Sequence, residues 1–557
     1  MNVENRAIAR GLFLSLFLSL AAVAQELDPP HIVVGEALFL ETRFAEFFHR
    51  HANGINDPLS NGDPVMNATA TTSGDLFGPF RGKSMNCRAC HLVDEHAVLD
   101  DQPGASQGGF RSYADFAQRS PIPSREDGKN LTLRNSPSQV NASVPREFEL
   151  FHFDGEFLSM PDLVHGTLLG RNYGWQAGEE AVALAHIAQV IKEDDGKHPL
   201  VDETPEYSEF SYAEILKGTA PELPAEITLD SKYRLDVSTA TDDEILDAIA
   251  VLVSEYVTDL NFSQDDDGYD TSPYDDFLRK NGLPSKPRDA ESPLEYSRRL
   301  RGAIDSLKSP QFITPADADP FASHEQEFRF GDLQLQGLKV FLCEPSDPAT
   351  TDFTLGGIGN CIACHQAPHF TDFTFHNTGV SQEEYDSVHG SGQFAKIEIP
   401  PLEGRSTNYR SYLPLKAQHL TSGTSQFADI PSLEAPGRTD LGLWNVFLNP
   451  AFPKPQDRIR QVLLRQYAGS NDAALLEKSV AAFKTPGLRD LGHSAPYFHT
   501  GRFGTLEDTM RFYVHFSEKA RSGAVRNADS ELGRIYLHRK DVVPLTAFLL
   551  SLNEDYE

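Results

Sequence analysis

Several residue types are scarce in this sequence, and each shortage excludes a class of protein. Cysteine accounts for 5 of the 557 residues, tryptophan for 2 and methionine for 5. A small disulfide-dense scaffold is therefore excluded. Lysine and arginine together number 49 against 81 acidic residues, which gives a formal net charge of −32. Because nucleic-acid affinity depends on basic side chains that neutralise phosphates, we expect no nucleic acid as a partner.

Long apolar runs are also missing beyond the first residues. Residues 1–24 contain two arginines, an apolar run that begins at Gly11, and the small-residue pattern Ala22-Val23-Ala24. This order is typical of a signal peptide, and we expect cleavage after Ala24. No later stretch reaches the roughly 20 apolar residues that a membrane helix needs. The sequence therefore predicts an exported protein without a membrane span.

Four of the five cysteines form two copies of one pattern. They read Cys87-Arg-Ala-Cys90-His91 and Cys361-Ile-Ala-Cys364-His365, and both are C-x-x-C-H. This spacing suits c-type haem attachment, because two thiols on one turn can form thioethers with the two vinyl groups while the adjacent histidine binds the iron. The sequence therefore predicts two covalently bound haems.

Zinc ribbons and redox dithiols also use C-x-x-C pairs. A zinc ribbon usually has both pairs within roughly 15–20 residues, whereas these pairs lie in opposite halves of the chain. A redox dithiol does not explain the two trailing histidines. The pattern therefore favours haem attachment, and Cys343, the remaining cysteine, is expected to be an unpaired thiol.

Helical periodicity dominates the rest of the chain. Long strand alternation is scarce, which predicts a mainly α fold with extensive loops. A capping box at Thr241 and Glu244 marks one helix start, and Thr505 caps another. The expected helices cover Gly35–His51, Ala181–Ile191, Asp242–Leu260, Leu294–Leu307, Leu333–Leu342, a segment from Thr505, and Leu545–Leu552.

An acidic segment divides the chain near its middle. Residues Ser263–Ser292 are rich in Asp, Ser, Pro and Gly, which is typical of a surface connection. We therefore expect an N-terminal haem domain with insertions over 25–292 and a C-terminal haem domain over 293–557. The stretch from the second haem motif to about Asp457 is expected to be rich in loops.

Three patches of sequence carry a family resemblance beyond the two haem motifs. They are CIACHQAPHFTDFTFHNTG from Cys361, AFKTPGLRDLGHSAPYFHTGRFGTLEDTMRFY from Ala482, and LRNSPSQVNASVPREFELFHFDGEF from Leu133. Together they resemble the bacterial di-haem cytochrome c peroxidase and MauG family. The resemblance implies two cytochrome c-like domains with one haem each, a periplasmic location and an oxidoreductase activity.

The resemblance also implies the iron ligands. His91 and His365 match the proximal ligands, and the distal ligand of the second haem should come from the helix that Thr505 caps, where the family has Met or Tyr. Counting along TLEDTMRFY puts this ligand at Tyr513, with Met510 one helical turn away as the alternative. A phenolate stabilises ferric iron, whereas a thioether raises the reduction potential.

The distal pocket of the first haem departs from the family pattern. The family's Gln and Glu spacing is not recovered in MPDLVHGTLLGRNYGWQAGEE, where Glu179, Gln176 and His165 are the candidate catalytic residues. Glu179 as a surface or capping carboxylate, and His165 as a direct iron ligand, are the alternatives. Phe153 stands where the family usually has a Trp between the haems.

The resemblance further implies a calcium site between the haems. Asn135, Ser494 and Pro496 match its ligands, and oxygen ligands suit calcium, although Asn135 could equally shape a turn. His376 and His499 lie in the recognisable patches, and we expect both to be hydrogen-bonded structural residues rather than iron ligands.

Three functions follow from the resemblance. The first is reduction of hydrogen peroxide at the His91 haem, with electrons from a small cytochrome c or cupredoxin entering through the His365 haem. The second is MauG-like oxidation of a protein substrate through high-valent haem, which Tyr513 favours and the missing inter-haem Trp disfavours. The third is electron transfer without catalysis, which the unrecognised distal pocket favours.

Overall fold

The computed structural model describes residues 28–56, 86–87, 90–91, 122, 125–129, 131–196, 210–316, 321, 326–345, 355–408, 426–435, 437–492 and 494–554. Within these ranges the fold is mainly helical, as predicted, with much irregular backbone. The named strands form two antiparallel pairs of two residues each. Short 3₁₀ turns cover Arg171–Tyr173, Ala225–Ile227, Ser231–Tyr233, Cys361–Ala363, Phe394–Lys396, Leu443–Asn445 and Leu532–Arg534.

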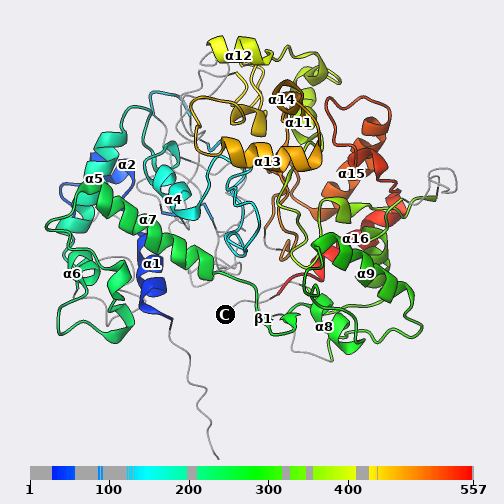
Figure 1. The fold of residues 1–557 in the computed structure, drawn as a ribbon, viewed down its shortest axis with the longest axis horizontal. Helices are drawn as coiled ribbons and strands as arrows, with labels where there is room; N and C mark the ends of the chain where they lie inside the picture. Colours follow the sequence, from blue (N-terminus) through cyan, green and yellow to red (C-terminus); the bar gives the residue numbers. More distant parts are fainter. Residues whose placement is uncertain are drawn as a thin grey trace, which may run out of the picture.

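The first group of helices lies on one side of the molecule (Figure 1). One apolar core unites them, and α1 packs along α7 within it. Gly35 of α1 permits this approach, because a Cβ there would overlap the Leu252 carbonyl oxygen. These helices are α1 (Pro30–Leu40), α2 (Glu46–His51), α4 (Met160–Leu168), α5 (Glu180–Glu193), α6 (Tyr212–Lys217) and α7 (Asp242–Asp259).

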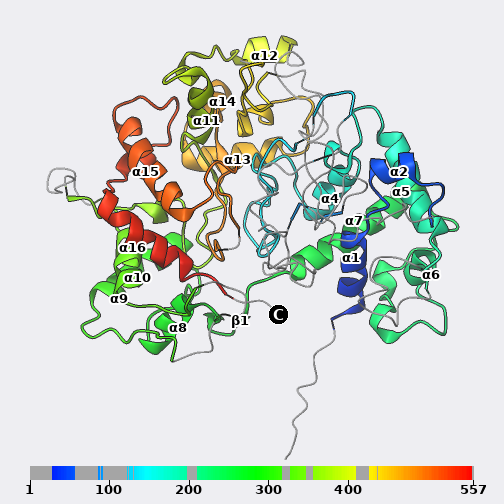
Figure 2. The same cartoon turned by 180° about the vertical axis from the view of Figure 1, so that it is seen from behind.

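A second group lies on the opposite side, and the view from behind shows the same separation (Figure 2). It has its own core, in which α10 packs along α16. Gly337 of α10 has the role of Gly35, because a Cβ there would overlap the Pro544 carbonyl oxygen. The helices are α8 (Pro273–Lys280), α9 (Pro293–Asp305), α10 (Asp332–Phe341), α15 (Leu506–Arg521) and α16 (Arg539–Leu550).

The two groups therefore share one packing motif. In each, a glycine-containing helix that precedes a C-x-x-C-H segment packs against a helix near the end of the same group. A Cβ at either glycine would force the helices apart, so these two positions require glycine for close approach rather than for backbone freedom.

A third core lies between and above the two groups in the view of Figure 1. It is built from residues 375–482 and also includes Leu150 of the first half. The loop-rich stretch expected here contains short helices as well. Its elements are β3 (Phe375–His376), α11 (Val380–His389), α12 (Leu402–Asn408), α13 (Gln456–Gln466), α14 (Asp472–Lys478) and β4 (Phe483–Lys484).

The acidic segment expected to be a surface connection is partly buried. Strands β1 (Gln264–Asp265) and β2 (Gly268–Tyr269) form a hairpin that lies between the two groups of helices (Figure 1). The α8 helix follows, and its apolar side chains belong to the second core. The surface interpretation holds for Gln264–Asp265, which are exposed, and was wrong for Tyr269 and the apolar face of α8, because composition hid the aromatic side chains. The division into two haem domains near Pro293 stays a prediction.

Most predicted helices are present within a few residues of their expected limits. The Thr241–Glu244 capping box at the start of α7 is confirmed by reciprocal hydrogen bonds. The single helix expected over Gly35–His51 was wrong, because the chain breaks between α1 and α2. At the break, Arg43 forms buried ion pairs with Glu41 and with Asp194, at 2.7 and 2.8 Å.

A buried ion pair ties the first half to the third core. Arg134 Nε lies 2.6 Å from Asp440 Oδ2, and Arg134 Nη1 lies 2.9 Å from Asp154 Oδ2. All three side chains are largely withdrawn from solvent. Loss of one partner from such a group costs about 3–5 kcal/mol, because a buried charge is left uncompensated.

Among the described residues, no helix combines the length and apolar character needed to cross a membrane. The predicted signal peptide, residues 1–24, lies outside the described ranges.

Candidate haem sites and their surroundings

The two C-x-x-C-H segments adopt the same backbone turn. The amide of His91 donates to the Cys87 carbonyl at 2.9 Å, and the amide of His365 donates to the Cys361 carbonyl at 2.7 Å. These bonds place each histidine one helical turn after its first cysteine. The described residues of two distant segments with the same spacing therefore form the same backbone hydrogen bonds.

The two histidine rings are oriented in the same way. His91 Nδ1 lies 2.7 Å from the Pro137 carbonyl oxygen, and His365 Nδ1 lies 2.8 Å from the Phe370 carbonyl oxygen. These contacts at Nδ1, which for His91 include the Gln139 side-chain amide at 2.7 Å, orient each ring and leave Nε2 as the nitrogen assigned to a metal. Burial lowers the pKa of His91 to about 4 and also lowers that of His365. Both rings are therefore neutral at pH 7, which is the form that binds metals.

The four thiols fit covalent attachment to a haem. None of the five cysteines forms a disulfide. Burial raises the pKa of Cys87 and of Cys361 to about 12, so the thiols are protonated and surrounded by apolar groups. The Tyr173 hydroxyl lies 3.1 Å from the Cys87 sulfur. Thiols that form no disulfide, beside an oriented neutral histidine, are the groups that a doubly attached haem requires.

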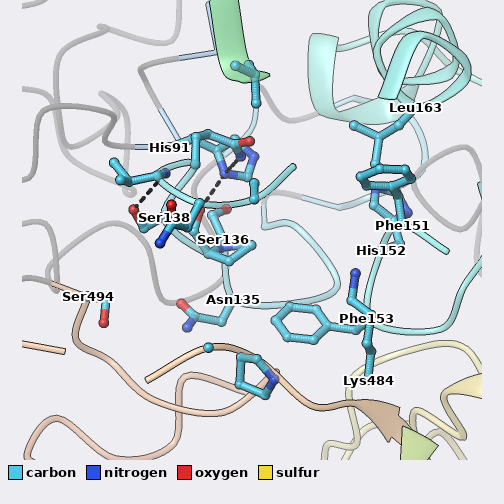
Figure 3. A pocket seen from close by; sticks show the side chains of 18 of the residues that line it. His91, Asn135, Ser136, Ser138, Phe151, His152, Phe153, Leu163, Lys484 and Ser494 are labelled. Carbon is cyan, nitrogen blue, oxygen red and sulfur yellow. Dashed lines mark hydrogen bonds between the residues drawn. The ribbon is translucent and has the colours of Figure 1, made fainter. Parts of the chain in front are cut away.

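A cavity of about 390 Å³ adjoins the first of these turns. His91 and Cys87 lie in its wall, and α4 contributes mainly apolar side chains such as Leu163 and Val164. Figure 3 shows His91 on one side of the cavity and Phe151, His152 and Leu163 on the other. The cavity therefore offers apolar walls and an accessible face opposite the predicted iron ligand.

His152 is a titratable side chain in this wall. Its Nδ1 lies 3.3 Å from the Glu156 Oε2 atom, and Glu156 is buried. Burial lowers the pKa of His152 to about 4, so its ring is a neutral base at pH 7. The backbone of His152 has φ 62°, in the left-handed region that non-glycine residues rarely adopt. Such outliers cluster at functional sites.

The three predicted distal residues lie elsewhere. Glu179 accepts two hydrogen bonds from Arg125, at 2.7 and 2.8 Å, and this partner lowers the carboxylate's pKa. The Gln176 side chain donates to an exposed Glu126, and His165 lies 3.1 Å from Asp247 at the surface. None of the three is among the described residues that line the cavity. Their catalytic role stays a prediction that these contacts do not favour.

Tyr513 lies close to the second turn. Burial, with further contributions from Cys364 and Cys361, raises the pKa of its phenol. No described residue forms a hydrogen bond with the Tyr513 hydroxyl, and its ring packs against Phe498. Met510 is buried in the same core. Tyr513 and Met510 therefore both belong to the core beside the second turn, and ligation by Tyr513 stays a prediction.

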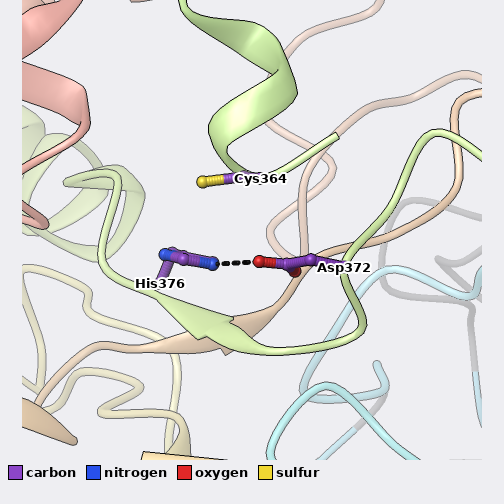
Figure 4. Close-up of side chains that lie close together, drawn as sticks. All are labelled: Cys364, Asp372 and His376. Atoms are coloured by element: carbon purple, nitrogen blue, oxygen red, sulfur yellow. Dashed lines mark hydrogen bonds and ion pairs between the residues drawn. The ribbon is translucent and has the colours of Figure 1, made fainter. Parts of the chain in front are cut away.

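A charged cluster supports the second turn. His376 Nε2 lies 2.9 Å from Asp372 and its Nδ1 lies 2.7 Å from Asp529. Although burial alone would lower it, Cys364 and the two carboxylates hold the pKa of His376 well above its usual value. Figure 4 shows Cys364 facing the His376–Asp372 pair. His376 is hydrogen-bonded, as predicted, and its structural role stays a prediction; we interpret the cluster as a support for the loop after His365.

The predicted calcium ligands lie in the wall of the same cavity as His91. The Asn135 side-chain nitrogen lies 2.6 Å from the Pro496 carbonyl oxygen, and Ser494 also lines the cavity. The Asn135 Oδ1 atom is buried and has no hydrogen-bond partner. A buried oxygen without a donor, beside a backbone carbonyl, fits a hard cation such as calcium.

The aromatic residues near the cavity follow the expected departure from the family. Phe153 lies in the cavity wall, and Figure 3 shows its ring pointing toward Asn135. Trp175 and Trp444 are buried in the first and third cores and do not line the described cavity. His499 is stacked on Phe483 with ring centroids 3.5 Å apart. Sequence reasoning missed His152, although its i, i+4 spacing from Glu156 was an available signal.

Comparison with known proteins gives sequence and structural similarities. No family model matches the chain. A cytochrome-c peroxidase IdrP2 of Denitromonas iodatirespirans is 28% identical over 197 residues, which cover 35% of this chain and 37% of that protein. The IdrP2 of Pseudomonas sp. strain SCT is 27% identical over 36% of this chain and 37% of that protein. The methylamine utilization protein MauG of Methylorubrum extorquens is 38% identical over 74 residues, 13% of this chain and 20% of MauG.

Solved structures align over most of the chain at low identity. The diheme peroxidase BthA of Burkholderia thailandensis aligns with a TM-score of 0.41 and 14% identity, over 95% of this chain and 87% of BthA. A MauG-like protein associated with microbial copper homeostasis aligns with a TM-score of 0.40 and 13% identity, over 95% and 91%. The chain matches little more than a third of the length of the curated peroxidases. These sequence matches support the resemblance of this chain to the bacterial di-haem cytochrome c peroxidase and MauG family.

Proposed function

We propose that this protein is a periplasmic di-haem oxidoreductase that reduces hydrogen peroxide with electrons from a small cytochrome c or cupredoxin. One observation carries the proposal: the histidine of each C-x-x-C-H segment is neutral and lies beside a backbone carbonyl, and His91 lines a large cavity that His365 does not line. The names of the matched relatives, cytochrome-c peroxidases, support the same activity.

The residues that would hold the cofactors follow from the two turns. Cys87 and Cys90 would attach the first haem with His91 as its ligand, and the corresponding triad from Cys361 to His365 would hold the second. A haem bound at His91 supplies the iron at which peroxide is reduced. The glycine-mediated helix pairs α1–α7 and α10–α16 support one haem domain in each half.

His152 is the group that we assign to proton transfer. Reduction of a peroxide requires a proton to move from one oxygen to the other, and a neutral base in the cavity wall can accept and return it. Glu156 orients the ring through the 3.3 Å contact with Nδ1 and stabilises the imidazolium when the proton is held. A base held by a carboxylate is the arrangement that general acid–base catalysis uses.

The second site lacks such a cavity in the described residues and is suited to electron entry. Aromatic side chains of α15 pack with Phe498 and Tyr513, and Tyr513 is the proposed distal ligand. A calcium ion held by Asn135 Oδ1 and the carbonyl oxygens of Ser494 and Pro496 would join the first half to the second. We propose it as a structural ion between the two sites.

Tyr513 also favours a second candidate function. Phenolate ligation stabilises oxidised iron, and a site that stays oxidised is suited to oxidising a residue on another protein, as in the MauG-like alternative. The two candidates differ in the electron donor, which is a small redox protein for one and the protein substrate for the other.

The test is the rate at which hydrogen peroxide oxidises a reduced small cytochrome c in the presence of the haem-loaded protein. Haem content per chain is measured first in the same preparation. We expect rapid turnover that saturates with the cytochrome. A haem spectrum that responds to peroxide without turnover would instead support protein oxidation, and two haems that never respond to peroxide would overturn both.

A further inference from the structure

Tyr269 contacts both the segment after Pro137, whose carbonyl oxygen contacts the His91 ring, and the loop that follows His365. It belongs to β2, in the hairpin that runs between the two groups of helices, and it is 5% exposed. Its phenol oxygen lies 2.6 Å from His369 Nδ1, and the Asn141 side-chain amide donates to the same oxygen at 3.3 Å. A residue of the acidic connection therefore reaches the interior and bridges two segments that are far apart in the sequence.

Each of its two partners lies close in the sequence to a backbone carbonyl that contacts a predicted iron ligand. Asn141 lies four residues after the carbonyl that accepts from the His91 ring, and His369 lies one residue before the carbonyl that accepts from the His365 ring. Both partners also line the cavity that contains His91. Covalent and hydrogen bonds thus connect the two ligand rings through Tyr269 without a gap.

The hydrogen bonds around Tyr269 define the direction of its proton. Because the Asn141 amide donates to the phenol oxygen, the phenol hydrogen is directed to His369 Nδ1. Burial lowers the pKa of His369 to about 4, so this nitrogen is an unprotonated acceptor at pH 7. Burial also raises the pKa of Tyr269. The resting pair is therefore a neutral phenol bonded to a neutral imidazole.

Oxidation changes this balance. A phenol that loses an electron becomes a very strong acid, so a hydrogen-bonded imidazole takes its proton at once. The Arg489 guanidinium lies 3.8 Å from the Tyr269 ring centroid, and Asp275 neutralises it through two hydrogen bonds of 2.9 and 3.0 Å. The cation makes electron loss more difficult, and its carboxylate partner moderates the effect.

Phe153 offers no such route. A phenylalanine ring has no ionisable hydrogen and is far more difficult to oxidise than a phenol. Where the resemblance implies an oxidisable Trp, this chain has a residue that cannot serve as an electron relay. His369 lies in the wall of the same cavity as Phe153, and its hydrogen-bonded pair with Tyr269 has the chemistry that Phe153 lacks.

We propose that Tyr269, with His369 as its proton acceptor, is the redox relay between the two haem sites. After peroxide oxidises the His91 site, Tyr269 gives that site one electron, its O–H bond breaks, and the proton moves to His369 Nδ1. This leaves a neutral tyrosyl radical and an imidazolium. One electron from the reduced His365 site and the returning proton then restore the phenol. The relay rests on the proposed function.

The experiment follows the radical and the electron separately. Haem-loaded protein with both haems oxidised is mixed with hydrogen peroxide, frozen rapidly and examined by electron paramagnetic resonance. We expect an organic radical whose hyperfine pattern changes when ring-deuterated tyrosine is incorporated, and its loss in Tyr269→Phe. Flash reduction of the His365 site then gives the rate at which the electron reaches the His91 site. That rate should fall about tenfold or more in Tyr269→Phe, equivalent to about 1.4 kcal/mol on the barrier.

Two further variants separate a relay from a structural role. Tyr274→Phe is the matched control, because Tyr274 is equally buried in the second core and its hydroxyl has no partner; it should keep the radical and the rate. His369→Gln keeps a polar side chain but not a proton-accepting imidazole. It should remove the deuterium-solvent effect on the transfer rate even if Tyr269→Phe fails to fold.

The outcomes are distinguishable from failure of the proposed function. Haem content and the spectral response to peroxide are recorded in every sample, and both must be normal for the relay to be judged. A normal peroxide response with no tyrosyl radical in the unmodified protein would overturn the relay. So would a radical and a transfer rate that persist in Tyr269→Phe.

Discussion

The two C-x-x-C-H regions are alike on the side of the histidine and unlike on the side that would face a ligand. The Nδ1 atom of each histidine lies beside a backbone carbonyl oxygen, at 2.7 Å for His91 and 2.8 Å for His365. Opposite His91 lies a cavity of about 390 Å³. Around His365 the described chain instead packs aromatic side chains and the phenol of Tyr513.

The difference separates attachment from reactivity. Five residues are sufficient to specify the turn, the thiols and the ligand, so attachment repeats wherever the pentapeptide occurs. What the iron can do there depends on residues far away in sequence, such as the α4 side chains and His152 at the first site and α15 at the second. Two motifs of the same pattern therefore have different surroundings, because His91 lines the cavity and His365 does not.

The largest effect should come from removing one attachment site at a time. Cys87→Ala with Cys90→Ala should leave one haem per chain and abolish peroxide turnover. Cys361→Ala with Cys364→Ala should also leave one haem, but the protein should lose electron acceptance from the small cytochrome instead. Haem absorbance per chain and the spectral response to peroxide measure both. Equal loss of the peroxide response in the two double variants would remove the functional distinction between the sites.

His152→Gln tests proton transfer in the cavity that His91 lines. Loss of a general acid–base should lower peroxide turnover by about 10²-fold or more, with haem content unchanged. His51→Gln is the control, because His51 is exposed and bonds to the Phe47 carbonyl away from the cavity. If Glu179→Gln caused the larger loss, proton transfer would belong to the residue that the sequence favoured.

Tyr513→Phe addresses the His365 site. Removal of the phenol oxygen should change the absorption spectrum of the His365 haem and raise its reduction potential, because a phenolate stabilises ferric iron. The His91 haem should be unaffected, as spectroelectrochemistry of the two haems would show. Met510→Leu conserves volume and should lower the free energy of unfolding by less than about 1.5 kcal/mol. A spectral change in Met510→Leu alone would transfer the ligand to Met510.

Calcium binding should have the smallest effect, because it acts between the sites rather than at either one. At a free concentration of one hundred times Kd, a ligand that binds only the folded state stabilises it by about 2.7 kcal/mol. The thermal unfolding temperature of the haem-loaded protein should therefore fall when a chelator removes the calcium. The shift should be absent in Asn135→Ala, which lacks the orphaned Oδ1 atom. An equal shift in both proteins would place the ion elsewhere.

Sequence patterns predicted the local features well. The haem turns follow from five adjacent residues, and the start of α7 follows from the Thr241–Glu244 capping box. The break between α1 and α2 was missed because it depends on Asp194, which is distant in sequence and pairs with Arg43. The burial of α8 was missed because an acidic, proline-rich composition masks its aromatic face.

The cavity wall depended on still longer contacts. His152 meets His91 across the cavity only after the 131–160 segment has packed on both halves, and no spacing in the sequence encodes that meeting. Tyr269 was hidden in the same way by the acidic connection around it. The candidate site could therefore be predicted as far as the cysteines and histidines of the motifs, and beyond them only with tertiary contacts.

The Arg134–Asp440 ion pair has a consequence for biosynthesis. The two residues are 306 positions apart. At ribosomal rates of about 5–20 residues per second, roughly 15 to 60 s pass between their appearance. During that interval Arg134 and Asp154 have no third partner, and the wall around His91 is incomplete. The first cysteine pair therefore exists well before its surroundings close.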